Sequence, residues 1–438
     1  MGYAFNIVFF IFRWKDPWRR SRIGLLTLAF LSSLCFASFL LSQRFVTTLP
    51  ASPYTIGRSI QVSFHLSIPS SSVSYNQSLP SNELTEVVNI SQDIEDVLSL
   101  QKEKIVDDIL KSYHFPGGPG LRNQSRPLSD LVPVLGGQPL RSVIIATWRS
   151  GSTFLGDILN SVPGNFYHYE PLLDHGIVQV RGPPRSKESL RYIRNLLNCN
   201  YTDMDKYLSY GQDHTWLFTH NIRLWEKCTE YPHLCWLPIF LNRFCSLFPF
   251  QSMKLVRLRL KLAEELLTDE KLGVKVVLVV RDPRGTMQSR RHRDWCPGNP
   301  DCDDPTLLCA DLVADYSAAL SFIKKYPKKF KIVRYEDFSL DPYKGTEDLF
   351  KFLGVNFGPE VKKFLDTHTK ANSGGVSSTF RNSKNAPFHW RSDLSFSEVQ
   401  NIQRKCSSAM DLWGYSKAVN ASHQRFFDPI KKKFSLKP

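Results

Sequence analysis

Residues 143–154 (VIIATWRSGSTF) combine an apolar, β-branched run with a small, hydroxyl-rich turn that carries one arginine. The run predicts a buried strand, and apolar residues at helical spacing after the turn predict a helix. The amides of residues 150–153 are then expected to lie unpaired at the helix N-terminus, where the macrodipole favours a phosphate or a sulfate. The turn is not a Walker A loop, because its cation, Arg149, precedes Gly151 instead of ending the loop as a lysine. The stretch predicts an anion site, with an ordinary strand-to-helix turn as the alternative.

A second strand end carries a similar combination of residues. Residues 275–280 (KVVLVV) are almost continuously apolar, which is typical of a strand buried on both faces of a parallel sheet. The segment RDPRGTMQS follows, and its Asp-Pro pair predicts the start of a helix. Arg281 would stand at the strand end and Ser289 about two turns into the helix, so both could bind a second anion. The alternative for Arg281 is a structural ion pair with Asp282 or Glu336.

Two anion sites on neighbouring strand ends suit a nucleotide with phosphates at both ends of its ribose. The segment TWRSGSTF resembles the 5′-phosphosulfate-binding loop of the sulfotransferases, and RDPRGTMQS resembles their 3′-phosphate-binding motif. The similarity is greatest to the Golgi carbohydrate 6-O-sulfotransferases that act on galactose, N-acetylglucosamine or N-acetylgalactosamine, and it covers about residues 140–415. Further matching segments are FYHYEP (166–171), VRYEDF (333–338), FRNS (380–383) with WR (390–391), and LWGY (412–415).

This resemblance implies an α/β, P-loop-like sulfotransferase fold with a central parallel sheet. It also implies 3′-phosphoadenosine-5′-phosphosulfate (PAPS) as co-substrate and no metal. The residues expected to bind the nucleotide are Arg149, Ser150, Gly151, Ser152, Thr153, Phe154, Arg281, Ser289 and Arg381. Arg149 would place a permanent charge near the leaving phosphate, where cytosolic sulfotransferases usually have a lysine. Whether Arg149 acts as a general acid or only as an electrostatic clamp stays open, because arginine does not readily donate its proton.

The transfer also needs a base for the acceptor hydroxyl, and Glu170 is the favoured candidate. It ends the short apolar strand 166–169, and similar glycan sulfotransferases place a carboxylate at the equivalent strand end. Partial desolvation is expected to raise its pKa toward neutrality. His168 and His175 compete for this role. His168 lies two residues before Glu170, so alternation along the strand predicts that both project from the same sheet face. Glu170, Arg149 and His168 are therefore the expected catalytic residues. The alternative for Glu170 is a structural pair with a nearby arginine. Trp390 and Arg391 are expected to be structural or to face the acceptor.

The N-terminus predicts a membrane anchor. Twenty residues without a charge, 23–42, are long enough to cross a bilayer, and most flanking cations precede them. A cleavable signal peptide is the alternative. The expected divisions are a cytosolic tail (1–22), a transmembrane signal anchor (23–42), a luminal stem (43–137), a catalytic domain (138–420) and a basic C-terminal tail (421–438). We therefore expect a single-pass type II protein of the Golgi membrane with a luminal catalytic domain.

Cysteines and charge agree with a luminal chain. Eight of the nine cysteines follow the anchor, and an even number in an oxidising compartment favours disulfides, although spacing does not reveal the pairing. A zinc site is less favoured, because the cysteines at 296–309 do not form paired C-x₂-C knuckles. Five N-glycosylation sequons are present. The net charge of +15 suits an acidic glycan or a nucleotide phosphate, whereas a luminal protein does not meet nucleic acid.

The spacing of apolar runs predicts one parallel α/β sheet. These runs occur at 142–147, 166–169, 253–258, 275–280 and 331–335. A helix is expected at 84–110 within the stem. Residues 176–250 hold four cysteines and many aromatic residues, and we expect this insertion to shape the groove for the acceptor.

The leading hypothesis is a carbohydrate sulfotransferase that takes a glycan or glycosaminoglycan as acceptor. The residues leave open whether the protein is a monomer or a homo-oligomer. A type II Golgi glycosyltransferase is the first alternative, because Asp301-Cys-Asp303 formally fits a D-x-D metal site. A non-catalytic, glycan-binding membrane protein is the second.

Overall fold

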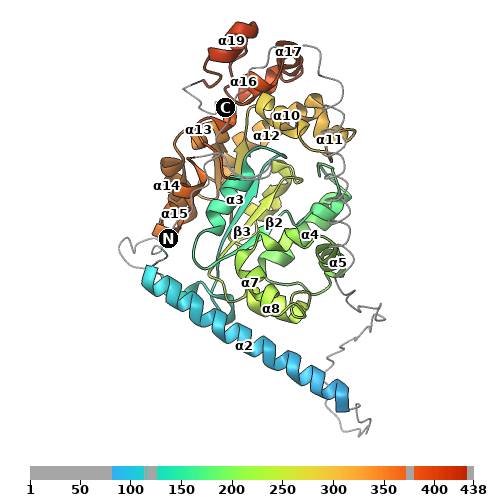
Figure 1. Cartoon of the computed structure of the whole chain (residues 1–438), viewed down its shortest axis with the longest axis vertical. Helices are drawn as coiled ribbons and strands as arrows, with labels where there is room; N and C mark the ends of the chain where they lie inside the picture. Colours follow the sequence, from blue (N-terminus) through green and yellow to red (C-terminus); the bar gives the residue numbers. More distant parts are fainter. Residues whose placement is uncertain (1–80, 113–114, 116–125, 371–378, 432–438) are drawn as a thin grey trace, which may run out of the picture. The chain divides into compact units, whose positions relative to one another are not determined.

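A five-stranded sheet forms the centre of the computed structural model, which describes residues 81–112, 115, 126–370 and 379–431 (Figure 1). Its strands are β1 (Leu140–Ile145), β2 (Asn165–Tyr169), β3 (Phe250–Leu255), β4 (Val274–Val280) and β5 (Phe330–Arg334). They lie in the order β2-β3-β1-β4-β5, and every neighbouring pair is parallel. The predicted parallel α/β sheet is confirmed, and each predicted strand starts within three residues of the observed one.

Parallel strands need long crossover connections, and helices provide them here. Three strands run at their carboxyl ends into α3 (Ser152–Asn160), α10 (Pro283–Arg291) and α13 (Tyr335–Leu340). The connection from β2 to β3 holds α4 (Arg185–Leu197), α5 (Asp205–Asp213), α6 (Trp216–Thr219), α7 (Ile222–Glu230) and α8 (Pro238–Cys245). The later connections hold α9 (Glu264–Leu267), α11 (Pro300–Asp303) and α12 (Pro305–Lys325). After α13 follow α14 (Pro342–Leu353), α15 (Pro359–His368), α16 (Trp390–Asp393), α17 (Phe396–Lys405), α18 (Ser407–Leu412) and α19 (Ala421–Phe426).

Strand β3 is completely buried although it contains polar residues. Burial of a polar group is tolerated only when it finds a hydrogen-bond partner. Ser252 accepts a hydrogen bond from Asn165 Nδ2 of β2 at 2.8 Å, and Gln251 Nε2 lies 3.1 Å from Cys199 Sγ. Lys254, the remaining polar residue, reaches the carboxyl edge of the sheet, where the candidate site lies.

Disulfides hold the helical connections. Cys199–Cys245 and Cys228–Cys235 close the insertion between β2 and β3, whose helices gather beside the edge strand β2 in Figure 1. The other two pairs are Cys296–Cys302 and Cys309–Cys406, the latter joining α12 to the residue before α18. All eight cysteines beyond the predicted anchor are thus paired, as the even count indicated.

The helix predicted at 84–110 exists as α2 (Ser81–Ser112), the long blue helix of Figure 1. It packs against the insertion. Ile94, Val97 and Ile105 are buried in the common core, and Glu95 forms an ion pair with Arg243 of α8 at 2.6 Å. This end of the predicted stem therefore belongs to the folded unit that carries the sheet, which the sequence pattern did not suggest.

Among the described residues, only α12 is long and apolar enough to pass as a membrane span by length and composition. Its residues Leu308, Leu312, Ala319 and Phe322 are buried within the domain, so α12 is a core helix. The cytosolic tail and the anchor predicted at 23–42 lie outside the described residues.

Candidate functional site

A cavity of about 920 Å³ opens at the carboxyl ends of β1, β2, β3 and β4. This volume lies within the range of small-molecule sites, and the carboxyl edge of a parallel sheet is where ligands of α/β proteins bind. The predicted site residues that line it are Arg149, Gly151, Ser152, Thr153, Phe154, Glu170, Arg281, Ser289 and Arg381. Ser150 and His168 do not line it. The structure therefore brings together residues from segments that are far apart in the sequence.

The turn after β1 is shaped for an anion. Gly151 precedes α3 with a φ of 86°, and no side chain caps the helix, so its first amides point to the cavity end of the turn without a capping partner. A Cβ atom at Gly151 would overlap the ring of Tyr335, so only glycine fits there. The Ser150 hydroxyl donates to Thr147 O at 2.9 Å and is buried. Ser150 thus stabilises the turn from inside, contrary to the expectation that its side chain binds the nucleotide.

The two predicted anion sites are joined by hydrogen bonds. Arg281 Nη1 donates to Arg149 O at 2.8 Å, and Arg149 Nε donates to Ser289 Oγ at 3.0 Å. Burial, together with the positive charges of Arg293 and Arg281, lowers the pKa of Arg149 to about 10. Arg149 is still charged at neutral pH. Mutually repelling, partly buried cations favour a bound anion, because it would relieve both the repulsion and the desolvation.

Arg281 does not form either of the structural ion pairs considered from the sequence. The carboxylate of Asp282 binds Arg284 at 2.6 Å, and Glu336 accepts a hydrogen bond from Asp282 N at 2.9 Å. Arg281 instead lies over the ring of Tyr335, with 5.0 Å between its Cζ atom and the ring centroid. Within the described part of the chain, no carboxylate lies at ion-pair distance from the Arg281 guanidinium, which lines the cavity.

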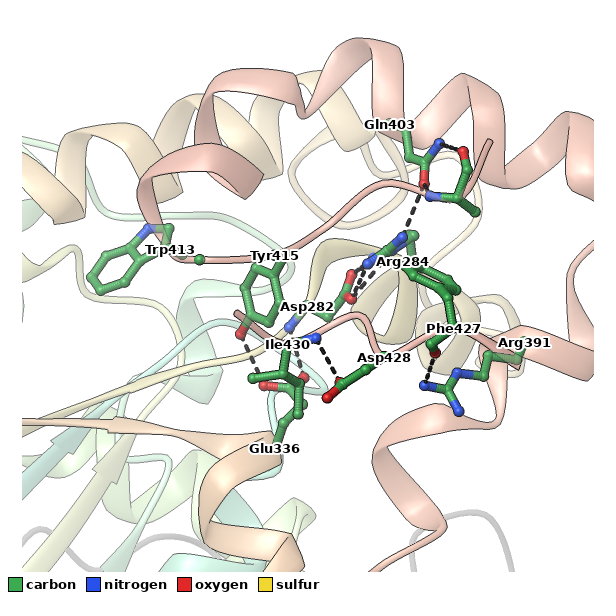
Figure 2. A network of polar contacts seen from close by, with 12 residues as sticks. Asp282, Arg284, Glu336, Arg391, Gln403, Trp413, Tyr415, Phe427, Asp428 and Ile430 are labelled. Carbon is green, nitrogen blue, oxygen red and sulfur yellow. Dashed lines mark hydrogen bonds and ion pairs between the residues drawn. The ribbon is translucent and has the colours of Figure 1, made fainter. Parts of the chain in front are cut away.

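Behind this strand end, the C-terminal segment holds the start of α10 in a buried polar network (Figure 2). Asp282 caps α10 by accepting from Arg284 N at 2.9 Å, as the Asp-Pro pair predicted. Arg284 donates to Gln403 Oε1 of α17 at 2.9 Å, and Tyr415 OH donates to Glu336 Oε2 at 2.9 Å. Burial, together with the charge of Asp282, raises the pKa of Glu336 to about 7. The network positions the backbone that carries Arg281.

Trp390 and Arg391 belong to the same network and do not line the cavity. The guanidinium of Arg284 lies 4.1 Å from the ring centroid of the fully buried Trp390. Arg391 Nη2 donates to Phe427 O at 2.6 Å (Figure 2). Of the two roles considered for Trp390 and Arg391, the structural one is observed.

Glu170 lines the cavity but carries two ion pairs. Lys254 Nζ lies 2.6 Å from its Oε1 atom, and Arg257 Nη1 lies 2.8 Å from its Oε2 atom. Burial alone would raise the pKa of Glu170, but the charges and hydrogen bonds of Lys254 and Arg257 outweigh it and lower the pKa to about 2. The expected upward shift is therefore wrong for this state of the site. The alternative considered for Glu170, a structural ion pair with a nearby arginine, is observed with Arg257, and Lys254 forms a second ion pair with the same carboxylate.

Lys254 and Arg257 are functional candidates that the sequence analysis missed. Besides binding Glu170, Lys254 Nζ lies 3.2 Å from Thr153 Oγ1 in the first turn of α3. One buried ammonium thus connects the anion-binding turn to the carboxylate. The sequence does contain a signal for Lys254. A charged side chain inside an otherwise buried strand must reach an oppositely charged partner or a binding site.

The two histidines that compete with Glu170 for the role of base, His168 and His175, do not line the cavity. His168 is 3% exposed, its ring lies 5.0 Å from that of Phe166 in the core, and burial lowers its pKa to about 3. Alternation along β2 predicted that His168 and Glu170 share a face, but Glu170 has a φ of 42°, so the strand geometry ends between them. His175 lies 3.9 Å from the buried Asp174 and also does not line the cavity.

The D-x-D segment is engaged elsewhere. Asp301 binds Arg181 at 2.7 Å, Asp303 Oδ2 accepts from Gly298 N at 2.6 Å, and Cys302 between them is in a disulfide. Within the described part of the chain, no group of three or more His, Cys, Asp or Glu side chains is arranged to hold a metal.

Comparisons with known proteins point in the same direction. The family model described as "Sulfotransferase domain" matches residues 139–414. Carbohydrate sulfotransferase 5 of Mus musculus is 25% identical over 333 residues, which cover 66% of this chain and 84% of the relative. Carbohydrate sulfotransferase 6 of Homo sapiens is 24% identical over 337 residues, which cover 67% and 85%. A solved structure of mouse sulfotransferase SULT7A1 complexed with PAP is 13% identical and covers 62% of this chain and 84% of its own, with a TM-score of 0.33, too low to support an argument.

Proposed function

Because the chain belongs to the sulfotransferase domain family and is therefore a PAPS-dependent sulfotransferase, we propose that it transfers sulfate to the 6-hydroxyl of a galactose, N-acetylglucosamine or N-acetylgalactosamine residue in a glycan. The names of the relatives support a carbohydrate as acceptor. The observation that carries the proposal is the contact between Arg281 Nη1 and Arg149 O at 2.8 Å within one cavity. One nucleotide can therefore meet both cations.

In this proposal the donor is held by the two strand ends. The amides at the start of α3 and the side chain of Arg149 bind the 5′-phosphosulfate, and Arg281 and Ser289 bind the 3′-phosphate. Charge-assisted hydrogen bonds from arginine suit phosphate and sulfate oxygens and are stronger than neutral ones. Arg381, which also lines the cavity, adds a cation from the C-terminal loop.

The transfer forms a bond between the acceptor oxygen and sulfur while the bond from sulfur to the 5′-phosphate oxygen breaks. The products are a sulfate ester and 3′,5′-adenosine bisphosphate, and the proton of the acceptor hydroxyl passes to a base. We assign this role to Glu170, which lines the same cavity as the donor loop. Cations and amides around the transferring group stabilise its charge without a metal.

The low pKa of Glu170 poses a problem for a base, and Lys254 offers the solution. Lys254 contacts both Glu170 and Thr153, so a sulfonate arriving at the turn competes with Glu170 for the ammonium. Loss of the stronger of its two ion pairs raises the pKa of Glu170 when the donor is bound. The same movement places the positive charge on the group that is transferred.

The test is transfer by the full-length protein in detergent. It is incubated with radiolabelled PAPS and a panel of desulfated keratan, chondroitin and N-acetylglucosamine-terminated oligosaccharides. We expect labelled product with at least one acceptor and none with the Arg281→Ala variant. Absence of transfer to every member of the panel would overturn the proposal.

For the cell, we propose a single-pass type II protein of the Golgi membrane whose folded unit, from α2 to α19, is the luminal catalytic domain. Four disulfides and exposed sequon asparagines at 200 and 420 support an oxidising, glycosylating compartment. Endoglycosidase treatment of the protein from microsomes should raise its gel mobility. Complete digestion by protease added to intact microsomes would contradict this topology.

A further inference from the structure

We propose that Trp216 and His214 of the insertion form the subsite that binds the sugar ring carrying the acceptor hydroxyl. This inference rests on the proposed function, because it names the part of the cavity that the acceptor occupies. Both residues line the cavity, and both lie in the connection between β2 and β3. The occupant is a neutral hexopyranose or N-acetylhexosamine.

Tyr169 connects this subsite to Glu170, the next residue. The ring of His220 stacks on Tyr169 with 3.6 Å between centroids and an interplanar angle of 7°. Lys254 Nζ also lies over the Tyr169 ring, 4.0 Å from its centroid. A ring stacked at 3.6 Å fills one face, so the ammonium must cover the other. Tyr169 therefore has no face left for a ligand and serves as a rigid support.

Trp216 rests against this support and keeps its own ring open. Its centroid lies 6.2 Å from that of Tyr169 at 73°, an edge-to-face contact that fixes the indole. Trp216 is 46% exposed, on the four-residue helix α6. Trp216 thus lies exposed on the cavity wall, and it is held against Tyr169, which directly precedes the proposed base. Its open ring face suits the C–H face of a pyranose. A sugar stacked there would place its ring close to Glu170.

His214 supplies a polar contact beside the indole. Its ring stacks on Tyr210 with 4.0 Å between centroids, and its Nδ1 atom lies 3.0 Å from Tyr210 O. A carbonyl oxygen only accepts, so Nδ1 carries the hydrogen and Nε2 of the neutral ring is the accepting atom. A sugar hydroxyl can donate to this atom. The stack on Tyr210 holds the imidazole in place.

The charges on this wall indicate a neutral ring. The insertion residues that line the cavity are Gly176, Ile177, Tyr210, His214 and Trp216, and none of them is acidic or basic by type except the histidine. Lys254 and Arg257, which also line the cavity, are bound to Glu170. A carboxylate on the stacked sugar would therefore find no lysine or arginine of the insertion to pair with. Hydroxyl and acetamido groups need only hydrogen-bond partners, and His214 and Tyr210 can provide them.

The test uses Trp216→Ala, Trp216→Phe and His214→Phe in the full-length protein. His214→Phe keeps the stack on Tyr210 and removes the accepting nitrogen. The matched control is Ile222→Ala, because Ile222 is 53% exposed on α7 in the same insertion and does not line the cavity. Trp216→Ala should raise the KM for the best acceptor of the panel about tenfold, with Trp216→Phe between it and the wild type. The KM for PAPS should not change in any variant.

Acceptor binding is also measured without turnover, by calorimetric titration of the same oligosaccharide into protein saturated with 3′,5′-adenosine bisphosphate. Thermal protection by that nucleotide reports whether each variant is folded. Should Trp216→Ala not fold, Trp216→Phe and His214→Phe carry the test. Unchanged acceptor KM and affinity in the folded variants overturn the subsite while the enzyme function stands. Oligosaccharide binding that depends on Trp216 in a protein without transfer supports the subsite and overturns the function. No binding by the wild type overturns the subsite.

Discussion

Arg149 Nε and Ser289 Oγ lie 3.0 Å apart although 140 residues separate them in the sequence. The bond links the turn after β1 to the helix after β4, which are neighbouring strands of the sheet. Arg149 thus lies between the two motifs that we propose to bind the donor, and any change at Ser289 also acts on the orientation of Arg149. The two motifs are therefore expected to act as one unit in donor binding.

Ser289→Ala should weaken binding of 3′,5′-adenosine bisphosphate about tenfold, because it removes one hydrogen bond to the 3′-phosphate and one partner of Arg149. Calorimetric titration measures the affinity. In a double-mutant cycle with Arg149→Lys, the two losses should not add. Strictly additive losses would contradict coupling between the motifs.

Arg281→Ala should weaken binding of the same nucleotide by about 100-fold or more, because it removes a cation that has charge-assisted contacts to a phosphate. Arg291→Ala is the matched control, since Arg291 ends the same helix and pairs with Glu398 at the surface. Equal affinities of the two variants would rule out a donor role for Arg281.

Glu170→Gln should lower kcat by about 10²–10⁴-fold, because it removes the proposed base, and should leave the affinity for 3′,5′-adenosine bisphosphate unchanged, because this nucleotide has no sulfonate to compete with Glu170 for Lys254. Single-turnover assays at saturating PAPS separate these effects. If kcat falls less than about tenfold, another group takes the proton.

The same variant should be less stable than the wild type at pH 7, by about 3–5 kcal/mol, because it leaves Lys254 and Arg257 buried without their partner. The pKa of Glu170 is lowered from 4.5 to about 2 in the folded state. Its contribution to stability is therefore complete above pH 4.5 and is lost as the pH falls toward 2. Denaturant unfolding at pH values from 7 to 3 should show that the difference in unfolding free energy between variant and wild type becomes smaller. A difference in unfolding free energy that does not change with pH would contradict the ion pairs of Glu170 with Lys254 and Arg257.

Glu336 should give the opposite dependence. Burial and the charge of Asp282 raise its pKa to about 7, so the folded state holds the proton more tightly than the unfolded state. The stability of the wild type relative to Glu336→Gln should therefore fall as the pH rises from 4.5 to 7, by roughly 2–4 kcal/mol in total. The exposed Glu265→Gln is the control. A relative stability that stays constant or rises over this range would show that Glu336 is ionised throughout.

Much of the fold and of the donor site could be predicted because the determinants are local. Residues 275–280 are almost continuously apolar, so both faces of the strand must be buried, as in a parallel sheet. The polar turn that follows must then lie at the carboxyl edge of the sheet. The same reasoning applies to residues 143–154. Parallel strands share one carboxyl edge, so Arg149 and Arg281 could be expected in one site before any distance was known.

The error at His168 has a local cause that the residue pattern does not reveal. Period-two alternation holds only while the backbone stays extended, and the positive φ of Glu170 ends it. His168 then remains in the core while Glu170 turns to the cavity. The misjudged pKa of Glu170 arose because its partners, Lys254 and Arg257, are 84 and 87 residues away.

The sequence by itself determined the parallel sheet, the two strand-to-helix turns at its carboxyl edge and the presence of paired cysteines, because each follows from neighbouring residues or from a simple count. Only the tertiary structure decided which cations surround Glu170, which cysteines pair, and which aromatic rings of the insertion remain open at the cavity. These features depend on contacts between distant segments. Their energies come from burial and Coulomb interactions that exist only once the chain has folded.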